Sequence, residues 1–202
     1  MKIITKNARQ TKQLAAKLAK RVSKSRRAKT AKVIGLVGDL GSGKTTFIQG
    51  FIKTLGVKHA VTSPTFLIFR PYLIKTKRRE EKRMRGRKRK EKKGKVISYN
   101  TVYHVDLYRV RSFKELMPLG FKNILANPRN IVLIEWADII RHQLPKDTIW
   151  IIMRHTSKES HRAIIIQNSK NLRQRRIRLR RKNVKLITAL SFWSAGWRRR
   201  IP

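Results

Sequence analysis

The segment GDLGSGKT at residues 38–45 constrains the fold more than any other part of the chain. It fits the pattern G-x-x-x-x-G-K-[ST] and lies between a short apolar run at 33–37 and an amphipathic run at 44–55. The first run predicts a buried strand, and the second predicts a helix that ends before Gly56. A strand, a glycine loop and a helix in this order are the context in which such a loop wraps around a phosphate chain.

The residue types of this loop suit a nucleotide. Its glycines allow the backbone amides to turn inward, and the Thr45 hydroxyl is expected to ligate Mg²⁺. The Lys44 amine is expected between the β- and γ-phosphates, where we predict that it is catalytic as well as nucleotide-binding. We therefore predict that the nucleotide is bound by Gly38, Asp39, Leu40, Gly41, Ser42, Gly43, Lys44, Thr45 and Thr46.

Two carboxylates are candidates for the chemistry at the phosphates. Glu135 ends the apolar run IVLIE, which predicts a metal-linked acid at the ligand-binding edge of an α/β sheet, although many strands end in an acid that is merely solvated. Asp106 shares the polar face of a predicted strand with His104, so it is a candidate for orienting or deprotonating water. The alternatives are that Asp106 pairs with an arginine at the surface, that His104 is structural, and that Trp136 lines the site or belongs to the core.

The remaining pattern predicts an α/β fold, with a P-loop NTPase-like mixed sheet flanked by helices. An amphipathic helix is expected at 11–22, and a short helix is expected to begin at Ser112 and be capped by Glu115. The runs at 65–74 and 96–108 predict the two arms of a hairpin, with Pro71 at a sheet edge. Further strands are expected at 131–136, 148–155 and 161–167, with a short helix at 137–144.

Charge is concentrated in three parts of the 202-residue chain. The formal net charge is +42, of which residues 1–32 carry +12, residues 75–95 carry +11 and residues 167–202 carry +12. We expect 75–95 to be a solvated basic insertion in the hairpin and 167–202 to be a flexible basic tail, so that 1–166 form the P-loop ATPase domain. The tail could instead be an amphipathic segment for RNA or an acidic partner.

Composition also excludes several classes. The chain has no Cys, which excludes disulfide frameworks, thiol nucleophiles and thiolate metal sites. It has no apolar stretch of the length needed to span a membrane, so we expect a soluble, cytoplasmic protein with no membrane partner.

Four motifs in order carry a family resemblance: GDLGSGKTTFIQG at 38–50, TSPTF at 62–66, YHVDLYR at 103–109 and IEW at 134–136. Together they resemble the TsaE (YjeE) family, the small bacterial ATPases of tRNA threonylcarbamoyladenosine biosynthesis. The resemblance covers about residues 5–166 outside the basic insertion. It implies a P-loop fold, Mg²⁺-dependent ATP hydrolysis, and docking onto TsaD-like and TsaB-like subunits that transfer the threonylcarbamoyl group to tRNA.

The resemblance also implies roles for particular residues. Ser63 and Thr65 match a switch-like segment near the γ-phosphate, Asp106 matches the acid that acts on water, and Glu135 matches the magnesium-linked acid. Thr11 matches a threonine near the nucleotide base, and Arg162 matches the arginine before the last strand. The resemblance thus implies that Thr11, Ser63, Thr65 and Arg162 also belong to the nucleotide-binding site. Two features depart from the family: the basic insertion at 75–95, and the segment KESHRAIII, which keeps Arg162 but lacks the usual glycine.

Other functions remain open at this point. One is a P-loop phosphotransferase acting on a small metabolite, although the core offers no separate acceptor domain. A GTPase is disfavoured because the chain has no N-K-x-D motif. The third is a basic RNA-binding protein with a degenerate nucleotide site, in which the basic segments contact tRNA directly; against it, no aromatic side chains are interleaved with the basic runs.

Overall fold

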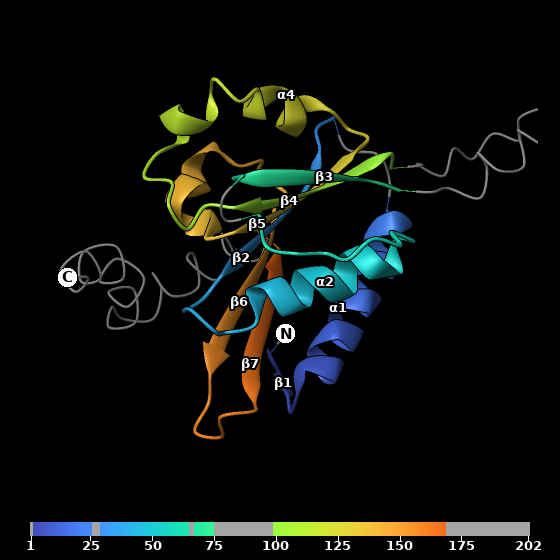
Figure 1. Ribbon diagram of the computed structural model, residues 1–202, viewed down its shortest axis with the longest axis vertical. Coiled ribbons are helices and arrows are strands. Elements are labelled where there is room, and N and C mark those ends of the chain that lie inside the picture. Colours follow the sequence, from blue (N-terminus) through green and yellow to red (C-terminus); the bar gives the residue numbers. More distant parts are fainter. Residues whose placement is uncertain (1, 26–28, 65–66, 75–98, 169–202) are drawn as a thin grey trace, which may run out of the picture.

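A single seven-stranded sheet organises the molecule (Figure 1). The computed structural model describes residues 2–25, 29–64, 67–74 and 99–168. The strands lie in the order β1-β7-β6-β2-β5-β4-β3. Their bounds are β1 Lys2–Thr5, β2 Lys32–Val37, β3 Phe69–Leu73, β4 Thr101–Asp106, β5 Asn130–Glu135, β6 Ile149–His155 and β7 Arg162–Asn168. The α-helices are α1 Ala8–Ser23, α2 Lys44–Thr54 and α4 Phe121–Ala126, and the 3₁₀ helices are η1 Phe113–Leu116 and η2 Ala137–Gln143.

The sheet is mixed, as the sequence predicts. Strands β6, β2, β5 and β4 are parallel neighbours at its centre. Antiparallel strands form both edges. At one edge β3 pairs with β4; at the other, β7 pairs with β6, and β1 pairs with β7. The central strands are buried on both faces, which explains why they appear in the sequence as short continuous apolar runs.

Alternation along the strands divides the core into two layers. In β2, Ile34 and Leu36 point to the face covered by α1 and α2, whereas Val33 points to the opposite face. That opposite face is covered by η1, α4 and η2, as Figure 1 shows. The predicted α/β architecture is therefore confirmed. Helix α2 packs on one face of the parallel strands, and its first turn lies beside their ends.

The two long helices lie side by side and cross very closely at Gly50 (Figure 1). A Cβ atom at Gly50 would lie 2.6 Å from the Cα atom of Lys12, so only glycine allows this approach. The contact ties α1 to α2, the helix that follows the glycine loop.

The first helix starts earlier than predicted, and a strand precedes it. The Asn7 side chain accepts a hydrogen bond from the backbone N–H of Gln10 at 2.9 Å, so α1 begins at Ala8 instead of near Thr11. Strand β1 was not predicted because its four residues carry little periodic signal. Its pairing with β7, from a distant part of the chain, supplies its backbone partners.

The two predicted arms of the hairpin are confirmed. Strands β3 and β4 pair antiparallel, and Pro71 lies in the edge strand β3. Both strands are shorter than the runs at 65–74 and 96–108. The basic insertion at 75–95 and the basic tail from residue 169 onward lie outside the described residues, so the division at residue 166 stays a prediction, while β7 itself extends to Asn168.

No helix in the described part of the chain is both long enough and apolar enough to cross a membrane.

Candidate functional site

Three parallel strands end at the same level and form one edge of the site. Asp106 at the end of β4 is in register with Glu135 at the end of β5, and Glu135 is in register with Leu36 of β2. The glycine loop follows β2 directly, so it emerges beside both carboxylates. This is the edge at which open α/β sheets bind ligands.

The glycine loop is packed tightly against β6. A Cβ atom at Gly38 would lie 2.2 Å from the backbone oxygen of Met153, so the loop needs glycine there. Gly43 has φ +93° and is the N-cap of α2, which directs the amide groups of the first helical turn toward the loop. The Ser42 hydroxyl is buried and has no hydrogen-bond partner in the described structure.

Side chains of the last two strands hold the outer carbonyl groups of the loop. His155 Nε2 lies 3.1 Å from the backbone oxygen of Leu40, and Arg162 donates to the backbone oxygen of Gly41 at 3.2 Å. Arg162 also donates to the backbone oxygens of Glu159 and His161. Arg162 therefore lies beside the loop, where its guanidinium contacts backbone carbonyl groups, and its predicted contact with the nucleotide stays a prediction.

Lys44 lies over the loop and is almost fully buried. Its Nζ donates to the backbone oxygens of Gly38 at 2.8 Å and Asp39 at 2.9 Å, and lies 4.0 Å from the centre of the Trp136 ring. Burial lowers the pKa of Lys44 below its ordinary value, opposed by the negative charges of Glu135, Asp106, Asp39 and Asp138. Trp136 therefore lines the site, one of the two alternatives left open by the sequence.

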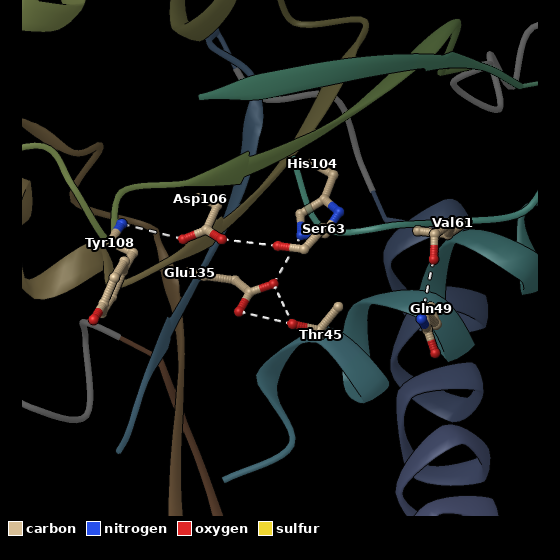
Figure 2. A network of polar contacts seen from close by, with 8 residues as sticks. All are labelled: Thr45, Gln49, Val61, Ser63, His104, Asp106, Tyr108 and Glu135. Atoms are coloured by element: carbon tan, nitrogen blue, oxygen red, sulfur yellow. Dashed lines mark hydrogen bonds and ion pairs between the residues drawn. The ribbon is translucent and has the colours of Figure 1, made fainter. Parts of the chain in front are cut away.

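Glu135 forms the centre of a polar network, drawn in Figure 2. The Thr45 hydroxyl donates to Glu135 Oε1 at 2.8 Å and lies 3.1 Å from Oε2. His104 Nε2 lies 2.8 Å from the same Oε1 atom. Both side chains of this His104–Glu135 pair are withdrawn from solvent, with exposed fractions of 0% and 4%. The merely solvated glutamate considered from the sequence is excluded by this burial.

Asp106 is held by two donors on the same edge (Figure 2). The Ser63 hydroxyl donates to Oδ2 at 2.8 Å, and the backbone N–H of Tyr108 donates to Oδ1 at 3.1 Å. Asp106 is only 6% exposed, so it is a buried carboxylate of the site. Its orientation is defined because each oxygen has its own donor.

The segment that carries Ser63 is anchored at three points. Gln49 of α2 donates to the backbone oxygen of Val61 at 3.0 Å, and Arg70 of β3 donates to the Thr62 hydroxyl at 2.8 Å. With the Ser63–Asp106 bond, this segment, residues 61–64, is tied to α2, β3 and β4. It is the part of the predicted switch-like motif that the structure describes, since Thr65 lies outside the described residues.

Two residues that border the site have backbones in the left-handed region. Within the described residues, Ile68 with φ +62° and Trp136 with φ +58° are the non-glycine residues with positive φ. The backbone oxygen of Ile68 accepts the N–H of Asp106 at 2.8 Å, and Trp136 follows Glu135 directly. Each such conformation costs about 1–3 kcal/mol, so the surrounding contacts must enforce both next to the two carboxylates.

The predicted residues are brought together to different degrees. The loop residues 38–46, Asp106, Glu135, Ser63 and Arg162 gather around one edge of the sheet. Thr11 is buried where β1 meets α1, and its hydroxyl lies 2.8 Å from the Thr5 hydroxyl. Its predicted contact with the base stays a prediction. The sequence favours a structural role for His104 and does not single out Gln49, Arg70 or His155. The bonds of these three residues join different parts of the fold, 115 positions apart for His155 and Leu40.

The donor set fits Mg²⁺. No group of three or more His, Cys, Asp or Glu side chains that could hold a metal occurs in the described residues. The Thr45 hydroxyl and the Glu135 carboxylate offer hard oxygen atoms, the kind that Mg²⁺ prefers, beside the glycine loop. Mg²⁺ is usually held by one or two such groups together with waters and substrate phosphates, which matches this sparse set.

Comparisons with known proteins agree on one family. The family model described as "Threonylcarbamoyl adenosine biosynthesis protein TsaE" matches residues 5–82 and 90–164. A Rickettsia felis protein named tRNA threonylcarbamoyladenosine biosynthesis protein TsaE is 33% identical over 168 residues, which cover 83% of this chain and 80% of the relative. The Bacillus subtilis protein of the same name is 31% identical over 132 residues, covering 65% of this chain and 67% of the relative.

A solved structure has the same architecture. The crystal structure of Bacillus subtilis YdiB superposes with a TM-score of 0.57 at 28% sequence identity, covering 85% of this chain and 87% of the YdiB chain. The mixed sheet and its flanking helices are therefore shared with a structure that is related in sequence as well.

Proposed function

Since the chain belongs to the TsaE family of tRNA threonylcarbamoyladenosine biosynthesis proteins, we propose that it is a Mg²⁺-dependent ATPase supporting threonylcarbamoyl modification of tRNA adenosine. As a member of this family, the chain is a P-loop protein of tRNA modification. We infer in addition that it hydrolyses ATP. The observation that carries this addition is the contact of the Thr45 hydroxyl with both oxygens of Glu135, at 2.8 and 3.1 Å. This contact joins the start of α2 to the end of β5 and supports the proposal that the two side chains hold Mg²⁺ together.

Different residues of the site have different roles in the proposed hydrolysis. The loop amides and Lys44 bind the phosphates, and Thr45 with Glu135 would hold Mg²⁺, which neutralises phosphate charge when bound. Asp106 accepts the proton of the attacking water or orients it, since its carboxylate is buried and held by Ser63 and Tyr108. The positive charge of Lys44 also stabilises the negative charge that develops as the phosphoanhydride bond breaks.

Partner subunits complete the proposal. We expect TsaD-like and TsaB-like subunits to dock onto this protein in the cytoplasm and to use its ATPase cycle in the transfer of the threonylcarbamoyl group. The printed names of the relatives place them in the same biosynthesis, which supports this assignment. The intact strand, loop and helix count against the alternative of an RNA-binding protein with a degenerate nucleotide site.

The test is ATP turnover of the full chain, alone and with the two partner subunits. Hydrolysis should require Mg²⁺ and rise when the partners are added. Thr45→Ala should lose Mg²⁺-dependent turnover, whereas Thr45→Ser, which keeps the hydroxyl, should retain most of it. Equal turnover of the Ala and Ser variants would show that hydrolysis does not need the Thr45–Glu135 pair. Turnover in the presence of EDTA would show that it does not need Mg²⁺.

A further inference from the structure

The solvent-facing side of α1 carries a row of four basic side chains and one glutamine. Arg9, Gln13, Lys17, Lys20 and Lys24 follow one another at spacings of four, four, three and four residues, which keeps them on one helix face. All five are exposed. The row runs from the first turn of the helix to its C-cap, about 22 Å at 1.5 Å per residue.

This row lies opposite the buried face of the helix. Thr11, Ala15, Leu18, Ala19 and Val22 point into the core. The apolar side of the helix is therefore buried in the core, and its solvent-facing side offers polar and charged groups to a partner. A membrane surface would need an exposed apolar face to insert, so the chemistry of α1 favours a hydrophilic polyanion.

The basic row has no acidic counterpart in its layer. Residues 1–38 contain no Asp or Glu, and α2, the other helix of this layer, contains none either. In the opposite layer, Glu115 lies in η1 and Asp138 in η2. Among the described residues, no base of α1 takes part in an ion pair. The positive charge of this face is therefore uncompensated within the described structure.

The arrangement works against the stability of the helix itself. Lys17 and Lys20, and Lys20 and Lys24, are like charges three and four residues apart, which repel each other. Arg9 in the first turn faces the positive end of the helix dipole, where an acid would be favourable. The dipole accounts for bases in the last turn, at Lys20 and Arg21, and leaves Arg9 and Lys17 unexplained.

From these observations we propose that the outer face of α1 binds the phosphate backbone of RNA, through Arg9, Lys17, Lys20 and Lys24. Charged rows of this kind contact phosphates and not base edges, so the binding carries little sequence preference. RNA is favoured over an acidic protein because the family acts in the modification of a tRNA. The proposal rests on family membership and on this surface, and is independent of ATP hydrolysis.

A pair of charge-matched variants separates this surface from the general basicity of the chain. The first replaces Arg9, Lys17, Lys20 and Lys24 by Gln. The control replaces four exposed bases in or next to the elements of the opposite layer, Lys114, Lys122, Arg129 and Lys146, by Gln. Both lower the net charge by the same amount in the full chain. Binding of unmodified tRNA is measured as a function of salt concentration.

The α1 variant should bind tRNA more weakly, and the slope of log affinity against log salt should fall by about 0.7–0.9 for each phosphate that the variant no longer neutralises. The control should keep the slope of the parent. Equal weakening in both variants overturns the proposal, because binding would then follow total charge. Unchanged binding in both variants overturns it as well. Circular dichroism and thermal unfolding should show that both variants keep the parent fold.

A local readout uses chemical acetylation of lysine side chains. Bound tRNA should protect Lys17, Lys20 and Lys24 from acetylation more than Lys114, Lys122 and Lys146, as measured by mass spectrometry of the full chain. Equal protection of both sets overturns the proposal. Stronger protection of the α1 lysines by anionic lipid vesicles than by tRNA would assign the surface to a membrane instead.

Discussion

His104 Nε2 lies 2.8 Å from Glu135 Oε1, the oxygen that also accepts a hydrogen bond from the Thr45 hydroxyl. His104 is in register with Leu133, two residues before Glu135 on the neighbouring strand, so the two side chains meet diagonally on one face of the sheet. Its Nδ1 atom is buried and has no hydrogen-bond partner in the described structure. Within the described structure, the side-chain hydrogen bond of the imidazole is therefore made with the carboxylate proposed to hold Mg²⁺.

The first prediction follows from this contact. His104→Ala should weaken Mg²⁺ affinity in the nucleotide complex by about 10–100-fold, as is typical when a group that orients a metal ligand is removed. His104→Gln, which can still donate to Glu135, should recover part of the loss. The readout is the Mg²⁺ dependence of fluorescent nucleotide binding, with thermal unfolding as the check on folding. Unchanged Mg²⁺ affinity in a folded Ala variant would contradict the role.

The second prediction separates the two carboxylates. Asp106→Asn should keep Mg²⁺-dependent binding of ATP and lose turnover, because Asp106 acts mainly on the transition state. Glu135→Gln should weaken Mg²⁺-dependent binding as well. Nucleotide titrations with and without Mg²⁺, combined with steady-state turnover, distinguish the two. If both variants behave alike, the division of roles is wrong.

The third prediction concerns pH. Burial holds the pKa of Lys44 below its ordinary value of 10.5, and bound phosphates would favour the ammonium form. The pKa of Lys44 should therefore be higher in the nucleotide complex than in the free protein, and binding should take up a proton between these two values. Affinity should fall as pH rises through the pKa of the free protein. Lys44→Met should bind weakly at every pH and lose this alkaline decrease. Lys53→Met, at an exposed lysine of the same helix, should behave as the parent.

The effect of Lys44 on folding has the opposite sign. Because its pKa is lowered in the folded protein, the charged amine disfavours folding below that pKa, and the penalty disappears as pH rises toward 10.5. Lys44→Met should therefore unfold at neutral pH with a free energy no lower than that of the parent. A clear destabilisation in urea unfolding would show that the bonds to Gly38 and Asp39 outweigh the cost of burial.

The fourth prediction tests the crossing of α1 and α2. A Cβ atom at Gly50 would lie 2.6 Å from Lys12 Cα and 2.7 Å from the Lys12 backbone oxygen, neither of which can move without the helix. Gly50→Ala should lower the free energy of unfolding by about 1–3 kcal/mol, the usual cost of overpacking. Lys53→Ala on the exposed side of α2 provides the control and should change stability little.

The fifth prediction concerns the basic segments. Removing residues 75–95 and 169–202 eliminates +11 and +12 of net charge and leaves the loop, Asp106 and Glu135 in place. Basal ATP hydrolysis should persist, while direct tRNA binding should weaken, and its salt slope should fall by about 0.7–0.9 for each phosphate that is no longer neutralised. A truncated protein that neither folds nor hydrolyses ATP would show that Phe192, Trp193 and Trp197 belong to the core.

Local patterns in the sequence determined most elements of this fold. The glycine loop, the strand before it and the helix after it are each specified by residues next to one another, because hydrophobic periodicity and glycine geometry act over a few positions. The candidate acids were found for the same reason, since Asp106 and Glu135 stand at the ends of recognisable strands. Strand β1 was not found, because it is stabilised by pairing with β7, from the far end of the described chain.

Only the tertiary structure decided how the site residues are connected. Nothing near His104 in the sequence indicates that it meets Glu135, and nothing near Gln49 or Arg70 indicates that they hold residues 61–64. These bonds arise from strand register and from the packing of α2 against the sheet, which bring together side chains and backbone groups of different elements, 31 positions apart for His104 and Glu135. The positive φ angles of Ile68 and Trp136 have the same origin, because local preference alone disfavours them and surrounding contacts must enforce them.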